Sequence, residues 1–146
     1  MQDQPSAGRI DGKTHLLPVR VYFEDTDFTG IVYHANYLRF FERGRSDFLR
    51  LSGIGHTELL HGPDPTVLAA RRLEIEFVKA ARIDDALLVS SRFAARQGAR
   101  LTMAQEIHRG GDLIAAARVE VCCLWPDGRP KRPPSGFMAL VAPYLP

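Results

Sequence analysis

The sequence predicts a single α+β domain in which one antiparallel β-sheet packs on one long helix. Three observations support this fold class. A strand pattern with a period of two comes first, one long helical pattern follows at residues 35–51, and four more strand-like segments fill residues 67–125. The chain has 146 residues, which is enough for one sizeable core and typical of one domain.

The first strand is predicted from the alternation along residues 17–23. Leu17, Val19, Val21 and Phe23 are apolar, and mostly polar residues stand between them, as in a half-buried strand. Residues 1–14 are polar, and we expect a flexible segment there, ahead of a domain that spans residues 15–146. This start lacks the apolar run of about 7–15 residues that a secretory signal needs, so we expect no export.

The long helix is predicted over residues 35–51, where large apolar side chains recur at helical spacing and form one stripe: Tyr37, Phe40, Phe41, Phe48 and Leu51. Gly44 lies on the side of this stripe. A glycine there costs about 1 kcal/mol of helix propensity relative to alanine. We therefore expect it to serve packing, by letting another backbone approach the helix closely.

Residues 52–65 are rich in glycine and turn formers and predict a connection, with a short helix at residues 57–60. Four strands are then expected at residues 67–78, 86–95, 101–109 and 113–125. Gly98 and the pair Gly110-Gly111 mark hairpin turns between the last three. Apolar and charged residues alternate along the first and last of the four, as in an antiparallel sheet with one covered face.

Composition excludes several classes of function. The chain carries 19 Lys and Arg against 17 Asp and Glu, a net charge of +2, without the basic footprint of a nucleic-acid binder. No apolar stretch approaches the roughly 20 residues that cross a bilayer. The only cysteines, Cys122 and Cys123, are adjacent and cannot form an ordinary disulfide within a strand, which favours a reducing, cytoplasmic location. The five histidines lack metal-binding spacing, and no glycine-rich phosphate loop is present.

Residues 25–42 are the most informative segment. Asp25 and Asp27 flank Thr26, Gly30 follows, and the helical pattern begins near His34. A carboxylate in this loop could lie close to the unpaired backbone N–H groups of the helix start, an arrangement that suits attack on a carbonyl group. The alternative is that Asp27 only caps a turn, as aspartate often does.

The same segment carries a resemblance to a known family. The residues that match are Tyr22, Glu24, Asp25, Thr26, Asp27, Gly30, Val32, Tyr33, His34, Asn36, Tyr37, Glu42 and Arg43, with a weaker second patch at residues 77–87. In these residues, and in the order of its elements, the chain resembles the YbgC-type acyl-CoA thioesterases. These belong to the 4-hydroxybenzoyl-CoA thioesterase group of hotdog-fold proteins. The resemblance covers about residues 15–135. Ala80 departs from it, because such proteins commonly carry proline there.

The resemblance implies a hotdog fold, active dimers that often pair into tetramers, and active sites at the subunit interface. It implies hydrolysis of an acyl-CoA to a carboxylic acid and CoA, with Asp27 as the catalytic carboxylate. Asp27 would either attack the thioester carbonyl, forming an anhydride, or activate water as a general base. His34 would donate its backbone N–H to the carbonyl oxygen. Its imidazole could orient the substrate or a neighbouring carboxylate, although a histidine near a helix start is more often a capping or packing residue. CoA is part of the substrate, so no separate cofactor and no metal are expected.

Further site residues are expected around this centre. Gly30, Val32, Tyr33 and Tyr37 are candidates to bind the substrate. Tyr33 and Tyr37 could line the acyl pocket, although an aromatic stripe is more often plain core. Asp25 is expected either to hold the loop or to tune Asp27 electrostatically, rather than to act as a second catalyst. The phosphates of CoA call for basic residues at the entrance, and the candidates are Arg71, Arg72, Lys79, Arg82, Lys131 and Arg132, above all the last three.

Two other functions stay open at this point. The chain could be a non-catalytic hotdog module that binds an acyl ligand or a partner protein. It could also be a hotdog hydratase or dehydratase, which would need a histidine and a carboxylate placed for proton transfer at carbon. Asp27 beside the turn at Gly30 favours the thioesterase.

Overall fold

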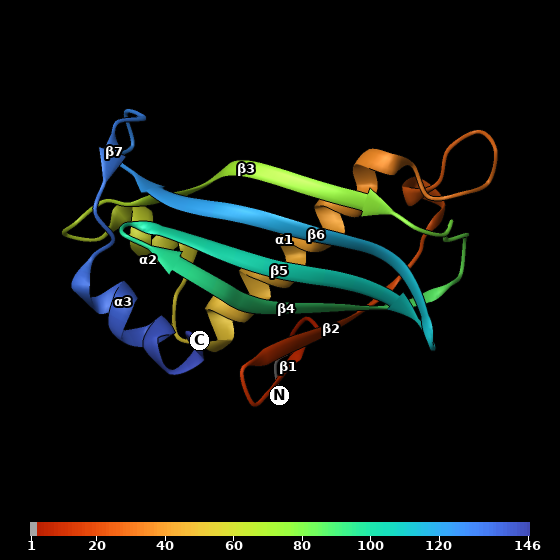
Figure 1. Ribbon diagram of the computed structural model, residues 1–146, viewed down its shortest axis with the longest axis horizontal. Helices are drawn as coiled ribbons and strands as arrows, with labels where there is room; N and C mark the ends of the chain where they lie inside the picture. Colours follow the sequence, from red (N-terminus) through yellow and green to blue (C-terminus); the bar gives the residue numbers. More distant parts are fainter. Residues whose placement is uncertain (1–2) are drawn as a thin grey trace.

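The centre of the sheet forms because three apolar, alternating strands are joined by two tight glycine turns. The computed structural model describes residues 3–146, and in it these strands are β4 (Ala86–Gln97), β5 (Arg100–Arg109) and β6 (Asp112–Leu124) (Figure 1). Gly98 and Gly110 adopt φ angles of +61° and +59°, a left-handed conformation that glycine reaches without strain. Both predicted hairpins are therefore confirmed.

The remaining strands extend this centre on both sides. β2 (Thr14–Arg20) pairs with β4, and the short β1 (Arg9–Asp11) pairs with β2. On the other side β3 (Val67–Phe77) pairs with β6, as does the two-residue β7 (Pro130–Lys131). All pairs are antiparallel, in the order β1-β2-β4-β5-β6-β3. The long strand β3 thus lies at an edge of the sheet.

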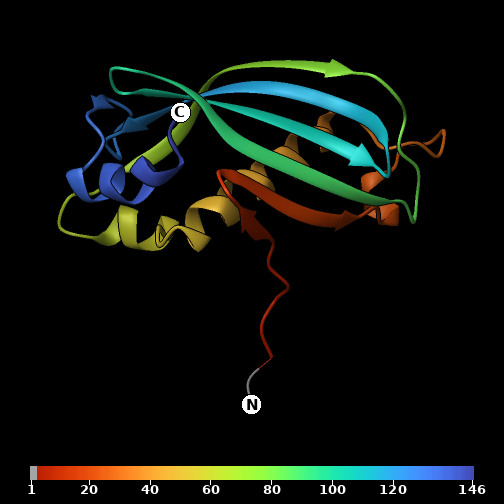
Figure 2. The ribbon, with the colours of Figure 1, turned by 60° about the horizontal axis from the view of Figure 1, so that its bottom comes forward.

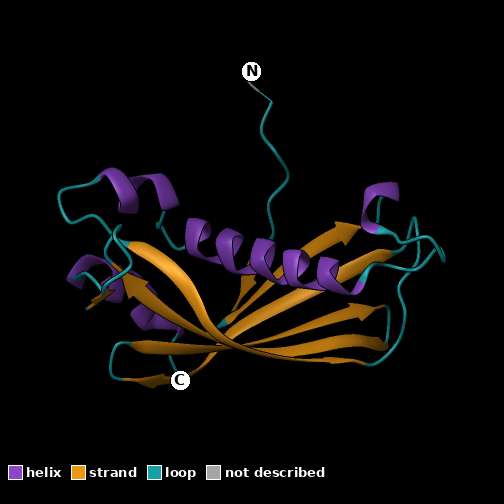
Figure 3. Ribbon diagram, turned by 90° about the horizontal axis from the view of Figure 1, so that it is seen from above, coloured by secondary structure: helices purple, strands orange, loops and turns teal. Residues whose placement is uncertain are grey.

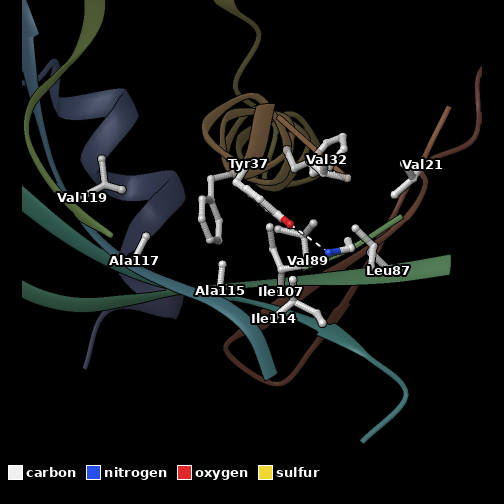
Figure 4. Packing of buried hydrophobic residues seen from close by; sticks show 13 residues of the cluster. Val21, Val32, Tyr37, Leu87, Val89, Ile107, Ile114, Ala115, Ala117 and Val119 are labelled. Atoms are coloured by element: carbon white, nitrogen blue, oxygen red, sulfur yellow. Dashed lines mark hydrogen bonds between the residues drawn. The ribbon is translucent and has the colours of Figure 1, made fainter. Parts of the chain in front are cut away.

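The helix α1 (His34–Leu51) lies in the concave face of the sheet, which curls around it as the hotdog fold requires (Figures 2 and 3). The predicted stripe faces the sheet except at its last member: Leu51 is 39% exposed. Tyr37, Phe40 and Phe41 join one buried cluster with the sheet, and Figure 4 shows Tyr37 pointing into it beside Val89 and Ile107. Phe48 belongs to a second cluster at the other end of the helix.

At Gly44, α1 packs tightly against the sheet. A Cβ atom on this residue would lie 3.0 Å from Ser91 Oγ and 3.0 Å from a methyl carbon of Val89. Beneath it, the buried amide of Gln105 donates hydrogen bonds to Phe41 C=O and to Ser91 Oγ, both 2.8 Å long. The predicted packing role of Gly44 is confirmed, although side chains rather than backbone approach it.

The N-terminal hairpin is tied to the helix through Asp47. His15, which is fully buried, lies 2.7 Å from Asp47 Oδ2, and Gly8 N–H donates to the same oxygen at 2.8 Å. Arg50 pairs with the other oxygen. Burial raises the pKa of Asp47, but the hydrogen bonds from His15, Gly8 and Arg50 outweigh this and hold that pKa below its ordinary value. Residues 9–16 pair as a hairpin anchored in this way, so the flexible segment predicted for residues 1–14 is too long. Residues 1–2 of that segment lie outside the described residues.

Other boundaries also differ from the sequence-based expectation. The first strand ends at Arg20, not near Phe23, because the chain turns into a short 3-10 helix, η1 (Phe23–Asp25). α2 (His56–His61) replaces the shorter helix expected at residues 57–60. α3 (Ser135–Val141) and the 3-10 helix η2 (Ala142–Tyr144) were not predicted, and α3 contributes Phe137 and Val141 to the second cluster. Among residues 3–146, no helix is both long and apolar enough to cross a membrane.

Gly44→Ala should destabilise the fold by about 1–3 kcal/mol, because the added methyl group overpacks the contact with β4. Gly136→Ala is the matched control, since a Cβ on Gly136, within α3, meets no atom within 4 Å. The control should be neutral or stabilising by up to about 1 kcal/mol. Urea unfolding measures both, and equal effects of the two substitutions would contradict the packing role.

Candidate active site

The loop before α1 is a tight turn closed by backbone hydrogen bonds. Thr26 and Val32 form an isolated antiparallel bridge. Inside it Asp27 N–H donates to Ile31 C=O at 2.8 Å, and Gly30 N–H donates to Asp27 C=O at 3.1 Å. Gly30 has a φ angle of +86°, which explains why the turn carries glycine there. The turn fixes the direction in which the Asp27 side chain extends from the backbone.

Asp25 holds this loop against the helix start. It is buried, and its two carboxylate oxygens accept hydrogen bonds from Tyr22 N–H at 2.8 Å and from the Asn36 amide at 2.6 Å. Its backbone carbonyl accepts from Tyr33 N–H at 2.9 Å. These contacts agree with the structural role expected for Asp25, because both oxygens are already engaged.

Asp27 is more accessible and has different partners. Its Oδ1 accepts from Thr29 N–H at 2.8 Å and from the Thr29 hydroxyl at 2.7 Å. The Thr29 hydroxyl is the main cause of a pKa below the ordinary aspartate value, assisted by backbone N–H groups of the turn and opposed by partial desolvation. Among residues 3–146, no donor forms a hydrogen bond with Oδ2. Asp27 therefore does cap a turn, yet it keeps one charged oxygen free at neutral pH.

The start of α1 supplies a donor close to this carboxylate. His34 is the first helical residue, and in the part of the chain that the structure describes its backbone N–H has no acceptor. The positive end of the helix dipole lies at the same point. Asp27 and His34 both line a surface pocket of about 320 Å³. The pocket thus offers a carboxylate and a hydrogen-bond donor on one wall, a combination that can attack a carbonyl carbon and stabilise its oxygen.

The rest of the lining is largely apolar. Phe77, Val78 and Ala80 come from the end of β3 and the segment after it, and Val32 and Tyr37 come from the loop and from α1. The Phe77 ring lies 5.7 Å from the Tyr37 ring and 6.4 Å from the His34 ring. Phe77 was not predicted as a site residue, and its only signal in the sequence was the weak family patch at residues 77–87.

Tyr37 contributes its ring but not its hydroxyl group. The hydroxyl accepts a hydrogen bond from Ala81 N–H at 3.0 Å inside the core, as the dashed line in Figure 4 marks. Burial raises the pKa of Tyr37, so the phenol stays neutral. Tyr37 therefore lines the pocket and also belongs to the hydrophobic core, the two roles that the sequence left open for it.

Tyr33 and Arg82 lie near the loop without lining the pocket. Tyr33 is half-exposed, and its ring packs 4.5 Å from the His34 ring. Arg82 pairs with Ile31 through the backbone, which places its exposed side chain beside the loop. Lys79 does line the pocket, and its ammonium group donates to Asp112 at 3.0 Å.

Lys131 and Arg132 lie elsewhere. β7, which contains Lys131, is at the opposite end of the sheet from the start of α1 (Figure 1). The Lys131 side chain is only 5% exposed; its ammonium group lies 2.6 Å from Asp64 Oδ1 and 4.4 Å from the centre of the Trp125 ring. Within one chain, these two residues take no part in the pocket of Asp27. Among residues 3–146, no cluster of three or more His, Cys, Asp or Glu residues could hold a metal ion.

Comparison with known proteins identifies the family. Residues 29–116 match the family described as the thioesterase superfamily. The chain is 38% identical over 108 residues to the acyl-CoA thioesterase YbgC of Haemophilus influenzae, covering 74% of this chain and 79% of that protein. It is 34% identical over 124 residues to the acyl-CoA thioester hydrolase YbgC of Escherichia coli, covering 84% and 91%. The chain belongs to the thioesterase superfamily and to its YbgC-type branch.

A solved structure supports the same assignment. The crystal structure of a probable thioesterase from Bartonella henselae superposes with a TM-score of 0.80 at 43% identity, covering 83% of this chain and 99% of that one. The hotdog fold is therefore confirmed. The family match begins two residues after Asp27, so the role of Asp27 rests on the geometry described above.

The two aspartates should respond differently to the same substitution. Asp25→Asn replaces one carboxylate oxygen with an N–H₂ group, which then faces one of the two donors, Tyr22 N–H or the Asn36 amide, and leaves it without an acceptor. We therefore expect a loss of about 1–3 kcal/mol in the free energy of unfolding. Asp27→Asn keeps the oxygen that Thr29 needs and should change this free energy by no more than about 0.5 kcal/mol. Urea unfolding of both variants checks this, and an equal loss for Asp27→Asn would make Asp27 a structural residue.

Proposed function

We propose that this member of the thioesterase superfamily hydrolyses an acyl-CoA to a free carboxylic acid and CoA, with Asp27 as the catalytic carboxylate. The observation that carries the proposal is the pocket in which the charged Asp27 lies beside the unpaired N–H of His34. The names of the YbgC relatives, an acyl-CoA thioesterase and an acyl-CoA thioester hydrolase, support the reaction type.

The chemistry follows from these two groups. An oxygen atom, either from Asp27 or from a water that Asp27 deprotonates, bonds to the thioester carbon, and the electron pair of the C=O bond moves to oxygen. The backbone N–H of His34 and the helix dipole stabilise that negative charge. The C–S bond then breaks and CoA leaves as a thiolate that takes up a proton. In the first route water afterwards hydrolyses the anhydride formed with Asp27.

A homodimer paired through β3 suits this function. β3 is a long edge strand, and Leu73 and Phe77 are 37% and 48% exposed on it. Such an edge is usually covered. Its charges are also self-complementary: antiparallel pairing of two copies about Leu73 sets each Arg72 opposite Glu74 of the partner subunit, with no like charges face to face. A tetramer would follow from pairing two such dimers.

The remaining expectations become part of the proposal. Arg82 is the best placed of the three favoured basic residues to meet a CoA phosphate, because it borders the loop of Asp27 and carries an exposed side chain. The thiols of Cys122 and Cys123 are free, which fits a protein of the reducing cytoplasm. Burial raises the pKa of Cys123 to about 11, so this thiol stays protonated and takes no part in the reaction. CoA enters as part of the substrate, with no separate cofactor.

Asp27→Asn should lower kcat/KM for thiol release from acyl-CoA esters by about 10²–10⁴. The purified protein and the variant are assayed on short, long and aromatic esters, after folding and assembly have been checked.

The pH profile of kcat/KM gives a second prediction, because the pKa of Asp27 lies below its ordinary value of 3.8. The Asp27 carboxylate should cause no fall in kcat/KM between pH 5 and 8. Protonation of Asp27 should lower kcat/KM only as the pH drops through that lowered pKa.

An absence of turnover on every ester would instead favour a binding module. Formation or loss of a carbon-carbon double bond without thiol release would favour a hydratase. Turnover that survives Asp27→Asn would overturn the mechanism.

Arg72→Glu should weaken the dimer, because it places two like charges face to face across the β3 pair. The exchange of both residues, Arg72→Glu with Glu74→Arg, should restore it. Arg72 also pairs with Glu74 of its own chain at 3.1 Å, and this pair too is lost in Arg72→Glu and restored in the double exchange. Because it is exposed, it contributes at most about 1 kcal/mol. Sedimentation at several concentrations measures the dimer, and an assembly insensitive to both variants would contradict this pairing.

A further inference from the structure

Thr29 binds the Asp27 carboxylate twice, through two different donors. Its backbone N–H lies 2.8 Å from Asp27 Oδ1, and its hydroxyl oxygen lies 2.7 Å from the same atom. Because both donors engage one oxygen, they hold the plane of the carboxylate and leave the other oxygen to the substrate or to a water. A hydrogen bond to an ionised acceptor is about twice as strong as one between neutral groups.

The turn itself does not depend on the Thr29 hydroxyl. Two backbone hydrogen bonds already close it, from Asp27 N–H to Ile31 C=O at 2.8 Å and from Gly30 N–H to Asp27 C=O at 3.1 Å. The backbone N–H of Thr29 adds a third, which a residue without a hydroxyl group would also supply. The hydroxyl is therefore an addition that serves the carboxylate rather than the turn.

A second threonine in the same loop uses its hydroxyl differently. Thr26 donates to the Phe23 backbone carbonyl at 2.8 Å, and in the part of the chain that the structure describes its hydroxyl makes no hydrogen bond with Asp27. Such a contact with a nearby backbone group is common for threonine in turns. The two threonines carry the same group on either side of Asp27, but only Thr29 directs it at the charged side chain.

Thr29 does not line the pocket that Asp27, Ile31 and His34 share. An effect of Thr29 on a substrate held there must therefore pass through Asp27. Because threonine branches at Cβ, few side-chain rotamers are open to it, and its hydroxyl is held in place before the substrate arrives. A carboxylate that is oriented in advance has less freedom to lose on reaching the reacting geometry.

We propose that Thr29 is a positioning residue for the thioesterase reaction, which fixes the Asp27 carboxylate through Oδ1 so that Oδ2 is the reacting oxygen. This inference rests on the proposed function and adds a residue to it. Thr29 is not a catalytic residue, because it touches no reacting atom.

The same two donors suit both routes open to Asp27. In the nucleophilic route Oδ2 bonds to the thioester carbon, the C–S bond breaks, and the thiolate takes up a proton. Water then adds to the acyl carbon and gives up a proton. The bond from that carbon to Oδ2 breaks, and the electron pair returns to the carboxylate, which Thr29 stabilises. In the general-base route Oδ2 takes the proton of the attacking water, while Thr29 keeps Oδ1 in place.

The hydroxyl of Thr29 also helps to keep Asp27 ionised. It donates to the anion, and it is the largest of the effects that act on the pKa of Asp27. Removal of the hydroxyl should raise that pKa, because the anion then loses one of its donors. Orientation and charge of the carboxylate thus change together in one substitution, and each has its own measurement.

Thr29→Val removes the hydroxyl and keeps the branched shape and the backbone N–H. We expect kcat to fall about tenfold to a hundredfold with KM nearly unchanged, because the pocket keeps its lining while the carboxylate loses its orientation. The fall of kcat/KM toward low pH should begin at a higher pH than in the wild type. Thr29→Ser returns the hydroxyl and should restore both quantities in large part. An unchanged kcat, or pH profiles that coincide, would overturn the inference.

Thr26→Val is the matched control in the same loop. It removes the same group next to Asp27 but leaves both donors to Oδ1 in place, so kcat and the pH profile should stay near those of the wild type. Urea unfolding shows that both variants are folded. Equal losses of kcat in Thr26→Val and Thr29→Val would mean that the two hydroxyls only stabilise the loop, and the positioning role would be wrong.

A double-mutant cycle tests whether Thr29 acts through Asp27. When Thr29→Val is added to Asp27→Asn, the residual kcat/KM should change by less than about twofold, because the group that Thr29 positions no longer reacts. A second loss as large as that in the wild-type background would show that Thr29 acts independently of the carboxylate, which contradicts the inference.

The proposed function can fail separately from this inference. A wild-type protein that releases no thiol from any ester would remove both. Turnover that Asp27→Asn lowers strongly, but that Thr29→Val leaves unchanged, would remove only the role of Thr29.

Discussion

The contact of α1 with the sheet at Gly44 is the constraint on which the rest of the structure depends. The absent side chain lets the helix approach Val89 and Ser91, and the Gln105 amide joins the Phe41 carbonyl to the Ser91 hydroxyl at the same point. Buried amides must be hydrogen-bonded, so this network permits one placement of the helix along the strands. That placement positions α1 along its length: its N-terminal end carries His34 toward the loop of Asp27, and its middle carries Arg45 and Ser46 to the rim of an apolar pocket lined also by Leu49 and Phe137.

Asp25 and Asp27 carry the same carboxylate group but have different roles, because their surroundings differ. Asp25 is buried with both oxygens engaged, so its charge serves to join the loop to α1. Asp27, which lines the pocket, accepts hydrogen bonds from Thr29 through Oδ1, and among residues 3–146 no donor binds its other oxygen. The turn at Gly30 separates them, since it carries the second carboxylate away from the core. A loop held this firmly keeps its carboxylate in place without help from the substrate, which lowers the cost of orienting it for reaction.

Local patterns in the sequence predicted the parts of this fold that depend on local physics. The hairpins at Gly98 and Gly110 and the amphipathic α1 were predictable because turn geometry and helical spacing act over a few residues. The end of β2 was misplaced because the alternation continues to Phe23 although the chain has already turned, and β1 is too short to show a period. Lys131 was assigned to the substrate from its charge alone, whereas its position depends on distant pairing with Asp64 and Trp125. Phe77 escaped notice because only tertiary contact brings it beside His34.

The order of the strands affects how the protein folds during its synthesis. Among residues 3–146, β3 pairs with β6 alone, and the whole of β4 and β5 lies between these two strands in the sequence. During synthesis β3 therefore leaves the ribosome well before its partner exists, with both of its edges unpaired. Contacts so distant in sequence form slowly, and an unpaired apolar strand can meanwhile join other chains. The charges of Arg71, Arg72, Glu74 and Glu76 along β3 would keep the nascent segment hydrated until β6 arrives.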